Sequence, residues 1–417
     1  MTVIEVPYGK KSIKADLKGI KVDHLRPVDL PPVDLRVEVS GALEKPISHD
    51  GLSEFQGADV AIVVSDQTRP IPSKSILEVL IPKLKECGVS EHQITIIVGG
   101  GLHRRTGKLK EIVGKDVVES VGKAVIHDSR REEDLIYVGD TSRGTPIWIN
   151  KHFVQADKRV VTGMIDPHHF MGYTGGAKGA AIGIGGKKTI EANHSLLTAE
   201  GSRLGIMDGN PCREDVDEMG SKLGIDLIVN AVLNLNKQVA RVVAGHWLHA
   251  HREGVKFARK IVEAETPFQA DVVVTSPGGF PKDINLYQAQ KALSSAEMVC
   301  KPQGVIILVA ECPHGLGDEL FEETMKKFAT HEEVISYFQS RPFRMGIHKA
   351  WMWSRQLTSR KIILVSDKLS PKELEALKVD YALDLERAIK KGKELTTMKR
   401  VLVMPLASST VPTRKTD

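Results

Sequence analysis

Several loops of this sequence carry residue types that could bind an anion or move a proton. Arg69 lies between Thr68 and Pro70, where its guanidinium could form a fork for a carboxylate or a phosphate. His103 follows three glycines, and glycine allows backbone to approach a ligand closely. Taken singly, Arg69 fits a surface turn equally well, and a lone histidine is more often structural than catalytic.

The segment 166–178, DPHHFMGYTGGAK, holds the densest set of such residues. His168 and His169 are adjacent, and neighbours in an extended segment point to opposite faces. We therefore expect at most one of them to reach the same pocket as His103. The loop 174–178, TGGAK, could present N–H groups to a phosphate, although a glycine-rich turn before a helix is the alternative.

A further histidine, His194, lies in IEANHSLLT, where the pattern predicts a helix. By itself it is more typical of a satisfied helical histidine than of a metal ligand. H-E-x-x-H spacing is absent, and GIGGKKT at 183–189 has an extra lysine before the threonine that a P-loop requires. No G-x-G-x-x-G fingerprint opens a nucleotide-binding fold, so an ordinary NAD or ATP enzyme is disfavoured.

Short β-branched runs must position these loops. Runs at 59–66, 93–101 and about 158–166 predict strands, and SKSILEVLIPKLKECG between the first two predicts a helix from Ser73 to about Gly88. This is a strand–helix–strand unit of the parallel kind. Parallel α/β sheets bind ligands beyond the carboxyl ends of their strands, which is where these loops begin.

A second series of elements follows a helix at 251–265 and a linker at 266–270 that contains Pro267. Strands are expected from 271, at 304–311, at 360–367 and at 401–405, with a helix at 284–299. We predict an α/β fold of two domains with mainly parallel sheets, and an active site at the cleft between them. The expected domains are 1–265, 266–400, and a strand and mobile tail at 401–417 that could return to the first domain.

The composition narrows the class of protein. The 417 residues carry 58 basic and 53 acidic side chains, and this net charge of +5 makes no case for nucleic acid. The cysteines form no C-x-x-C pair, which is typical of a reducing compartment, and no run of about 18 apolar residues predicts a membrane span. No signal peptide is evident, so we expect a cytoplasmic protein with an apolar content of 41%, enough for real cores.

Taken together, the loops resemble the nickel-dependent lactate racemase family. The resemblance runs from 68 through Trp351 and comprises, in order, D-x-T-R-P, G-x-H-R, P-H with a following G-Y-T-G-G-x-K, A-N-H, and Y-Q-x-x-K on a helix. In this sequence the motifs stand at Asp66–Pro70, Gly101–Arg104, Pro167-His168 with Gly172–Lys178, Ala192–His194, and Tyr287-Gln288 with Lys291.

The resemblance implies a cofactor and a role for each residue. Enzymes of this family use a nickel-pincer nucleotide, in which a pyridinium mononucleotide holds Ni²⁺ through two sulfurs and a ring carbon. Lys178 would tether it through a thioamide, and His194 would be the protein's nickel ligand. His103 and His168 would be the acid/base pair. The further residues implied are Asp66, Thr68, Thr174, Gly175 and Gly176 for the cofactor, with Thr174–Gly176 near its phosphate, and Arg69, Tyr287, Gln288, Lys291 and Trp351 for the substrate.

The chemistry of a 2-hydroxy acid agrees with this set of residues. Removing the C2 hydrogen as a proton would create a carbanion beside a carboxylate, whereas its removal as hydride gives a planar keto acid when an electron sink is present. The hydroxyl proton must leave too, and neutral imidazoles accept protons near pH 7. Two cations, Arg69 and Lys291, could anchor the carboxylate.

The leading hypothesis is therefore a racemase or epimerase of a 2-hydroxy acid, supplied with cofactor by biosynthesis proteins. Two alternatives remain: a carrier of the nickel-pincer nucleotide without racemase activity, and a nickel-independent hydroxy-acid oxidoreductase or lyase. Leu102 and Ile182 depart from the family pattern beside the expected site, and lactate, malate, other short acids and sugar acids all stay candidates. Whether the chain forms a homo-oligomer is also open.

Overall fold

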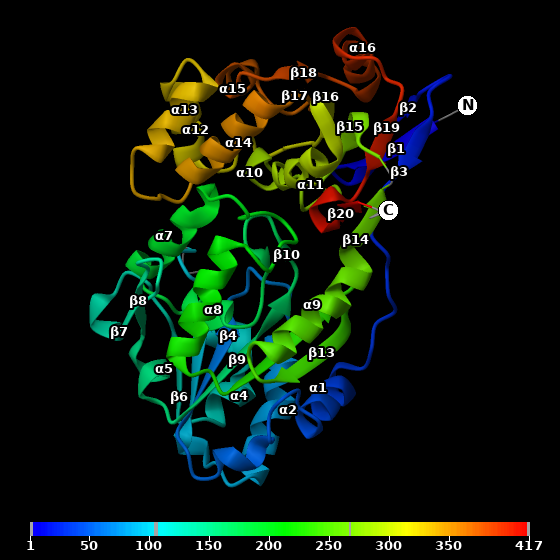
Figure 1. Cartoon of the computed structure of the whole chain (residues 1–417). Helices are drawn as coiled ribbons and strands as arrows, with labels where there is room; N and C mark the ends of the chain where they lie inside the picture. The colour runs from blue at the N-terminus through cyan, green and yellow to red at the C-terminus, as the bar shows by residue number, and fades with distance from the viewer. Residues whose placement is uncertain (1–2, 104–106, 267, 415–417) are drawn as a thin grey trace. The chain divides into compact units, whose positions relative to one another are not determined.

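The protein folds into two compact units. The computed structural model describes residues 3–103, 107–266 and 268–414, so Arg104 of the G-x-H-R segment and Pro267 of the expected linker lie outside the described residues. The central unit comprises residues 29–261, and the terminal unit comprises residues 1–28 together with 262–417. Each unit is an α/β structure built on a six-stranded sheet, as the sequence predicts (Figure 1).

The division of the chain differs from the expected one at both ends. Residues 1–28 belong to the same unit as the C-terminal part, because β3 (Val22–His24) pairs in parallel with β19 (Val401–Met404). Within the segment expected to be a mobile tail, Val411–Arg414 form β20, which pairs with β14 (Glu263–Thr266). The last strands therefore stay in the terminal unit and do not return to the central unit. Pairings between segments this distant have no local signature in the sequence.

The central unit has the strand order β13-β12-β9-β4-β5-β6, in which every pair is parallel except β12 with β13. All residues of VAIVVS in β4 are buried except Ser65, as expected of a β-branched strand in the middle of a sheet. One face of the sheet packs against α1 and α2, whose Leu43, Leu77 and Leu80 join the same apolar cluster. Figure 1 shows α8 and α9 in front of these strands.

The elements of the central unit are α1 (Leu35–Glu44), β4 (Val60–Ser65), α2 (Ser73–Glu86), β5 (Ile94–Gly99), α3 (Leu109–Val113), α4 (Lys115–Glu119), β6 (Lys123–Ile126), β7 (Leu135–Asp140), β8 (Pro146–Asn150), α5 (Lys151–Gln155), β9 (Lys158–Ile165), β10 (Pro167–His168), β11 (Gly172–Tyr173), α6 (Lys178–Ala181), α7 (Lys187–Ser195), α8 (Pro211–Leu223), β12 (Leu227–Leu233), β13 (Val239–Gly245) and α9 (His249–Val262).

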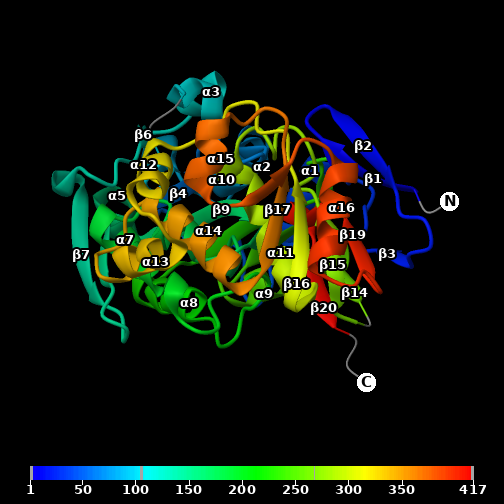
Figure 2. The same cartoon turned by 90° about the horizontal axis from the view of Figure 1, so that it is seen from above.

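The terminal unit has the order β18-β17-β16-β15-β19-β3, and all of these strands are parallel to their neighbours. One apolar cluster joins the sheet to α11 and α14, and another joins its opposite face to α16 and the β1–β2 hairpin. The strands can be followed from above in Figure 2. The helix expected at 284–299 is interrupted at Gln290 and forms two helices, α10 and α11.

The elements of the terminal unit are β1 (Val3–Tyr8), β2 (Lys11–Asp16), β3, β14, β15 (Ala270–Thr275), α10 (Leu286–Ala289), α11 (Lys291–Val299), β16 (Cys300–Val309), α12 (Glu319–Lys327), α13 (His331–Gln339), α14 (Ile347–Ser359), β17 (Lys361–Val365), α15 (Pro371–Leu377), β18 (Asp380–Ala382), α16 (Leu385–Leu395), β19 and β20.

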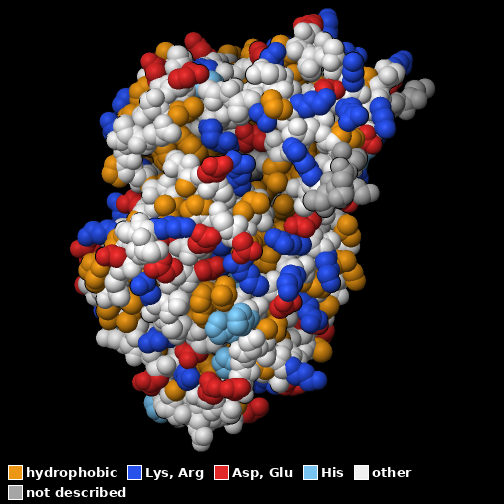
Figure 3. Space-filling view, viewed as in Figure 1, with side chains coloured by type: hydrophobic (Ala, Val, Ile, Leu, Met, Phe, Trp, Pro, Cys, Tyr) orange, Lys and Arg blue, Asp and Glu red, His pale blue; other side chains and the backbone are white. Residues whose placement is uncertain are grey.

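Two general properties of the chain bear on function. Among the helices of the described residues, none combines the length and the apolar character needed to cross a membrane. On the face drawn in Figure 3, basic and acidic side chains are interspersed over the surface.

Candidate functional site

The candidate site lies at the carboxyl ends of three adjacent strands. In the central sheet, β4 lies between β5 and β9, and the chain runs outward from β4 in one direction and crosses back to β9 on the other side. Such a reversal of strand order leaves a crevice where α/β sheets bind ligands. Asp66 follows β4, His103 follows β5 and His168 follows β9, so the sheet brings the three predicted loops together.

His103 is held by the loop that follows β4. Its Nδ1 lies 3.3 Å from Asp66 Oδ2 and 3.4 Å from Thr68 Oγ1, and Thr68 donates its own N–H to Asp66 Oδ1. Burial acts to raise the pKa of Asp66, but the hydrogen bonds from His103 and Thr68 outweigh it and hold that pKa below its usual value. The carboxylate is therefore ionised at neutral pH. With its proton on Nδ1, His103 keeps a lone pair on Nε2 for proton transfer.

The glycines before His103 have a steric function. A Cβ built on Gly100 would lie 2.6 Å from Asp66 Oδ2, closer than side chains tolerate. A side chain at this position would displace the carboxylate that contacts His103. The tightly packed loop therefore explains why the strand ends in glycines.

His168 lies in a more enclosed environment without a carboxylate partner. Its ring stacks on that of His169, with centroids 4.7 Å apart and planes at 16°. The expectation that these rings point to opposite faces is therefore wrong. The reason is that β10 ends at His168 and His169 already belongs to the turn leading to β11. Among the described residues, His168 Nδ1 has no hydrogen-bond partner.

Electrostatic coupling ties His168 to Lys178, Arg69 and His194. Burial lowers the pKa of His168 well below its usual value, and the charges of Lys178, His169, Arg69 and His194 lower it further. Burial likewise lowers the pKa of Lys178 well below its usual range, and Arg69 is the next largest cause. Burial therefore favours the neutral form of the Lys178 amine, which is its nucleophilic form.

His194 has the properties of a neutral metal ligand. It lies near the end of α7, and its Nδ1 is 3.1 Å from Asn193 Oδ1, which fixes the tautomer that carries the lone pair on Nε2. Burial, followed by the charges of Lys178 and His103, lowers its pKa to about 3. Across residues 3–103, 107–266 and 268–414, no group of three or more His, Cys, Asp or Glu residues could hold a metal ion. A metal at His194 would need its other ligands from a bound molecule.

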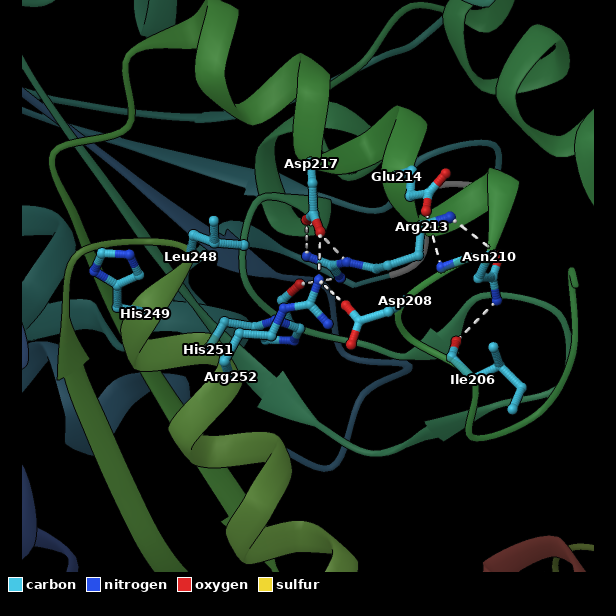
Figure 4. Close-up of polar contacts among 12 residues, drawn as sticks. Ile206, Asp208, Asn210, Arg213, Glu214, Asp217, Leu248, His249, His251 and Arg252 are labelled. Atoms are coloured by element: carbon cyan, nitrogen blue, oxygen red, sulfur yellow. Dashed lines mark hydrogen bonds and ion pairs between the residues drawn. The ribbon is translucent and has the colours of Figure 1, made fainter.

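The loop that leads to Lys178 is held by buried side chains, most of which appear in Figure 4. Arg213, with a fully buried side chain on α8, donates from Nη1 to Gly175 O at 3.1 Å and from Nε to Asp217 Oδ1 at 2.9 Å. His251 on α9 places its Nε2 2.8 Å from Thr174 O. The direction of the Lys178 backbone is therefore set by helices α8 and α9.

The same loop differs from the expected phosphate cradle. The Thr174 N–H donates to Asp166 O, and the Gly176 N–H donates to Asn230 Oδ1 at 2.7 Å. The Thr174 hydroxyl donates to Met164 O. Two of the N–H groups and the hydroxyl thus donate to partners inside the protein. These three donors fix the shape of the loop and do not point toward an anion.

Gly175 can only be glycine in this loop. Its φ is +86°, and a Cβ would lie 2.8 Å from Asn230 Oδ1 and 2.8 Å from a side-chain carbon of Ile165. Both the left-handed backbone and the close neighbours exclude a side chain.

The substrate residues predicted in the terminal unit lie on three helices. Tyr287 and Gln288 are on α10, and Lys291, the first residue of α11, donates from Nζ to Gln288 Oε1 at 2.7 Å. Trp351 lies on α14, where it is 7% exposed and packs 5.4 Å from the ring of Phe338. The structure thus brings Gln288 and Lys291 into direct contact, with Tyr287 on the same turn.

Sequence reasoning missed the residues that support the site. Asn193 precedes His194 directly and could have been suspected as the partner of its ring. Arg213 and Asp217 have the i, i+4 spacing of a helical ion pair, but nothing local shows that this pair is buried or that it reaches Gly175. Asn230 and His251 come from distant elements and give no sequence signal.

Known proteins similar to this chain share both of its parts. The family model for the lactate racemase N-terminal domain matches residues 8–205, and that for the lactate racemase C-terminal domain matches residues 265–411. A lactate racemase from Thermoanaerobacterium thermosaccharolyticum is 31% identical, and the match covers 100% of this chain and 100% of the relative. One from Lactiplantibacillus plantarum is 28% identical over 94% of this chain and 95% of its own.

Solved structures give the same result. The lactate racemase apoprotein from T. thermosaccharolyticum has a TM-score of 0.90 at 31% identity, covering 99% of this chain and 100% of its own. A Thermotoga maritima protein of 17% identity has a TM-score of 0.64, over 93% of this chain and 100% of its own, and shares the fold. From its sequence, its fold and the spacing of its site residues, this chain belongs to the lactate racemase family.

Proposed function

We propose that this chain is a racemase that interconverts the enantiomers of a short 2-hydroxy acid, with a nickel-pincer nucleotide as its cofactor. The observation that carries the proposal is the convergence of His103, His168, Lys178 and His194 at the strand-order reversal of the central unit. The names of the curated relatives make lactate the first acid to test.

The residues present fit such a cofactor. Lys178 offers a buried neutral amine for covalent attachment, and His194 offers one imidazole nitrogen to nickel. A pincer ligand that supplies sulfur and carbon donors would complete a coordination that the described residues do not provide by themselves. Asp66, Thr68 and the glycines at 175 and 176 border the same site. When bound, the cofactor supplies a sink for the C2 hydrogen and its electron pair.

The protein's own groups would handle the substrate's charge and its hydroxyl proton. Arg69, whose charge reaches both His168 and Lys178, would bind the carboxylate. In one direction, one of His103 and His168 would accept the hydroxyl proton of the incoming enantiomer while the other, in its protonated form, would donate a proton to the oxygen of the outgoing enantiomer; the reverse reaction exchanges these roles. An arriving carboxylate would also raise the pKa of His168, because a nearby negative charge favours the imidazolium form.

The two histidines are not equivalent. His103 is 39% exposed and has Asp66 beside its Nδ1, whereas His168 lies among cations and has no carboxylate partner. The Asp66 contact holds the His103 ring in place, whereas burial and the neighbouring positive charges hold the pKa of His168 well below its usual value.

Two alternatives remain from other functional classes. A carrier of the nickel-pincer nucleotide would need Lys178 and His194 but not His103, and a nickel-independent oxidoreductase or lyase would need no cofactor. The proposal also requires partner proteins that synthesise the cofactor, and it places the chain in the cytoplasm, where its four cysteines, free in the structure, would stay reduced.

The deciding experiment is chiral analysis of enantiopure 2-hydroxy acids incubated with the chain, prepared with and without the cofactor-making enzymes. We expect racemisation of at least one acid only in the cofactor-loaded protein, and its loss in both His103→Ala and His168→Ala. His92→Ala, which removes an exposed histidine just before β5, at the opposite end of that strand from His103, is the matched control. Full activity without nickel would support the oxidoreductase or lyase, and tight cofactor binding without turnover would support the carrier.

A further inference from the structure

Lys349 is a buried lysine that no acidic group neutralises among the residues that the structure describes. It lies in the first turn of α14 and is 1% exposed. Its Nζ has no hydrogen-bond partner among the described residues. Burying an unpaired ammonium is costly, and an apolar side chain of the same length would avoid that cost. The position therefore favours a function that requires an amine.

The surroundings of Lys349 identify what this function could be. Its Nζ lies 5.0 Å from the centroid of the Tyr287 ring, and Gln290 Nε2 donates to the Lys349 carbonyl at 3.2 Å. This hydrogen bond connects Gln290, at the break between α10 and α11, to the first turn of α14. Lys349 is also close enough to Lys291 for that lysine's charge to lower its pKa, and within the described part of the chain no other charged group does so.

Several other charged groups on the elements around α14 have partners of their own, and Lys291 is the one charged group that acts on Lys349 among the described residues. Burial first, and then Lys291, lowers the pKa of Lys349 well below its usual range, which favours the neutral amine in the empty protein. Asp318 acts on Tyr287 and caps α12 through the Phe321 N–H. The remaining pairs are Glu322 with Lys326 on α12, Glu333 with the Thr330 N–H on α13, His331 with Ser354, Lys361 of β17 with the Leu395 carbonyl, and Glu297 of α11 with Arg355.

We propose that Lys349 joins Lys291 in binding the carboxylate of the 2-hydroxy acid, in addition to the charge of Arg69. Lys349 takes up one proton when the anion binds, because an adjacent negative charge restores the ammonium form. This assignment adds a substrate residue to the proposed function and rests on it for the identity of the acid. The anion site itself needs no cofactor, and it can be tested without turnover.

The test compares Lys349→Met, which keeps the length of the side chain and removes its amine, with Lys390→Met on the exposed side of α16. In cofactor-loaded protein we expect Lys349→Met to raise the KM for the acid between about tenfold and a hundredfold, the effect of one charge-assisted hydrogen bond, with a smaller effect on kcat. Because Lys349 takes up that proton, the wild-type KM should rise with pH, by up to about tenfold per pH unit where the free amine is deprotonated and the bound amine protonated, and this dependence should be absent in Lys349→Met. Lys390→Met should behave as wild type.

A second measurement needs no activity and separates this inference from the proposed function. In thermal unfolding of the full chain without cofactor, Lys349→Met should melt at a higher temperature than wild type, because it no longer buries an unpaired amine. Sodium lactate should raise the wild-type midpoint more than the uncharged lactamide does, and this difference should vanish in Lys349→Met. An unchanged KM with an unchanged pH dependence, or equal lactate stabilisation of both proteins, would overturn the role of Lys349 even if the enzyme racemises lactate. Lactate stabilisation that depends on Lys349 without racemisation would overturn only the proposed function.

Discussion

Replacing Arg213 by Met should destabilise the central unit strongly. The Arg213 side chain is fully buried, and it pairs with Asp217 while donating to the Gly175 carbonyl. Removing one partner of a buried ion pair costs about 3–5 kcal/mol, because the other charge stays buried and unpaired. Arg252 Nη2 lies 3.4 Å from Asp217 Oδ2 and would partly compensate, so we expect a loss of about 3 kcal/mol in the free energy of unfolding.

The matched control is Arg143→Met, which breaks an ion pair with a residue of the same helix, α8. Arg143 bonds Glu214 of α8, but their side chains are 34% and 43% exposed. Pairs of this kind contribute at most about 1 kcal/mol. Urea unfolding followed by intrinsic fluorescence gives both values, and cofactor retention reports whether the Gly175 loop still presents Lys178. Equal and small losses for the two variants would refute the view that Arg213 holds this loop.

Three further predictions concern the same loops. Asp66→Asn should lower kcat about tenfold to a hundredfold, because His103 loses a charge-assisted partner worth about 1.5–3 kcal/mol; an unchanged rate in the chiral assay would exclude that role. Burial lowers the pKa of His251 in the folded chain well below the value of about 6.5 that it has in the unfolded chain. The free energy of unfolding is therefore greatest above pH 6.5. It decreases as the pH falls, by about 1.4 kcal/mol at pH 5.5. His251→Gln, which can still donate to Thr174 O, should flatten the urea-unfolding pH profile by that amount, and an identical slope in both proteins would contradict it. Gly175→Ala should cost about 2 kcal/mol or more through strain and overlap, and clearly more than Gly209→Ala, where φ is +74° but nothing lies within 4 Å of the added carbon.

Much of the site could be predicted because its loops follow strands with strong local signals. The runs that form β4, β5 and β9 are short, β-branched and buried, and parallel α/β sheets bind ligands at the ends of such strands. The order of these strands, β5-β4-β9, was not predictable from local pattern, and this order is what makes the three loops neighbours.

Features set by distant pairing or by short turns could not be predicted. The pairing of β3 with β19 places residues 1–28 in the terminal unit, and no composition change marks it. His168 and His169 stack because the strand ends between them, although alternation in an extended segment predicts the opposite. The buried partners of the Lys178 loop, Arg213 and His251, depend on the packing of α8 and α9.

The most direct test of the account follows the hydrogen at C2 of the substrate. The cofactor-loaded enzyme is incubated in ordinary water with one enantiomer of a 2-hydroxy acid that it turns over, labelled with deuterium at C2. If the hydrogen leaves with its electron pair and returns to the opposite face, both enantiomers at equilibrium retain the deuterium. Loss of the label to solvent at the rate of racemisation would show proton abstraction at C2 and would contradict the central claim.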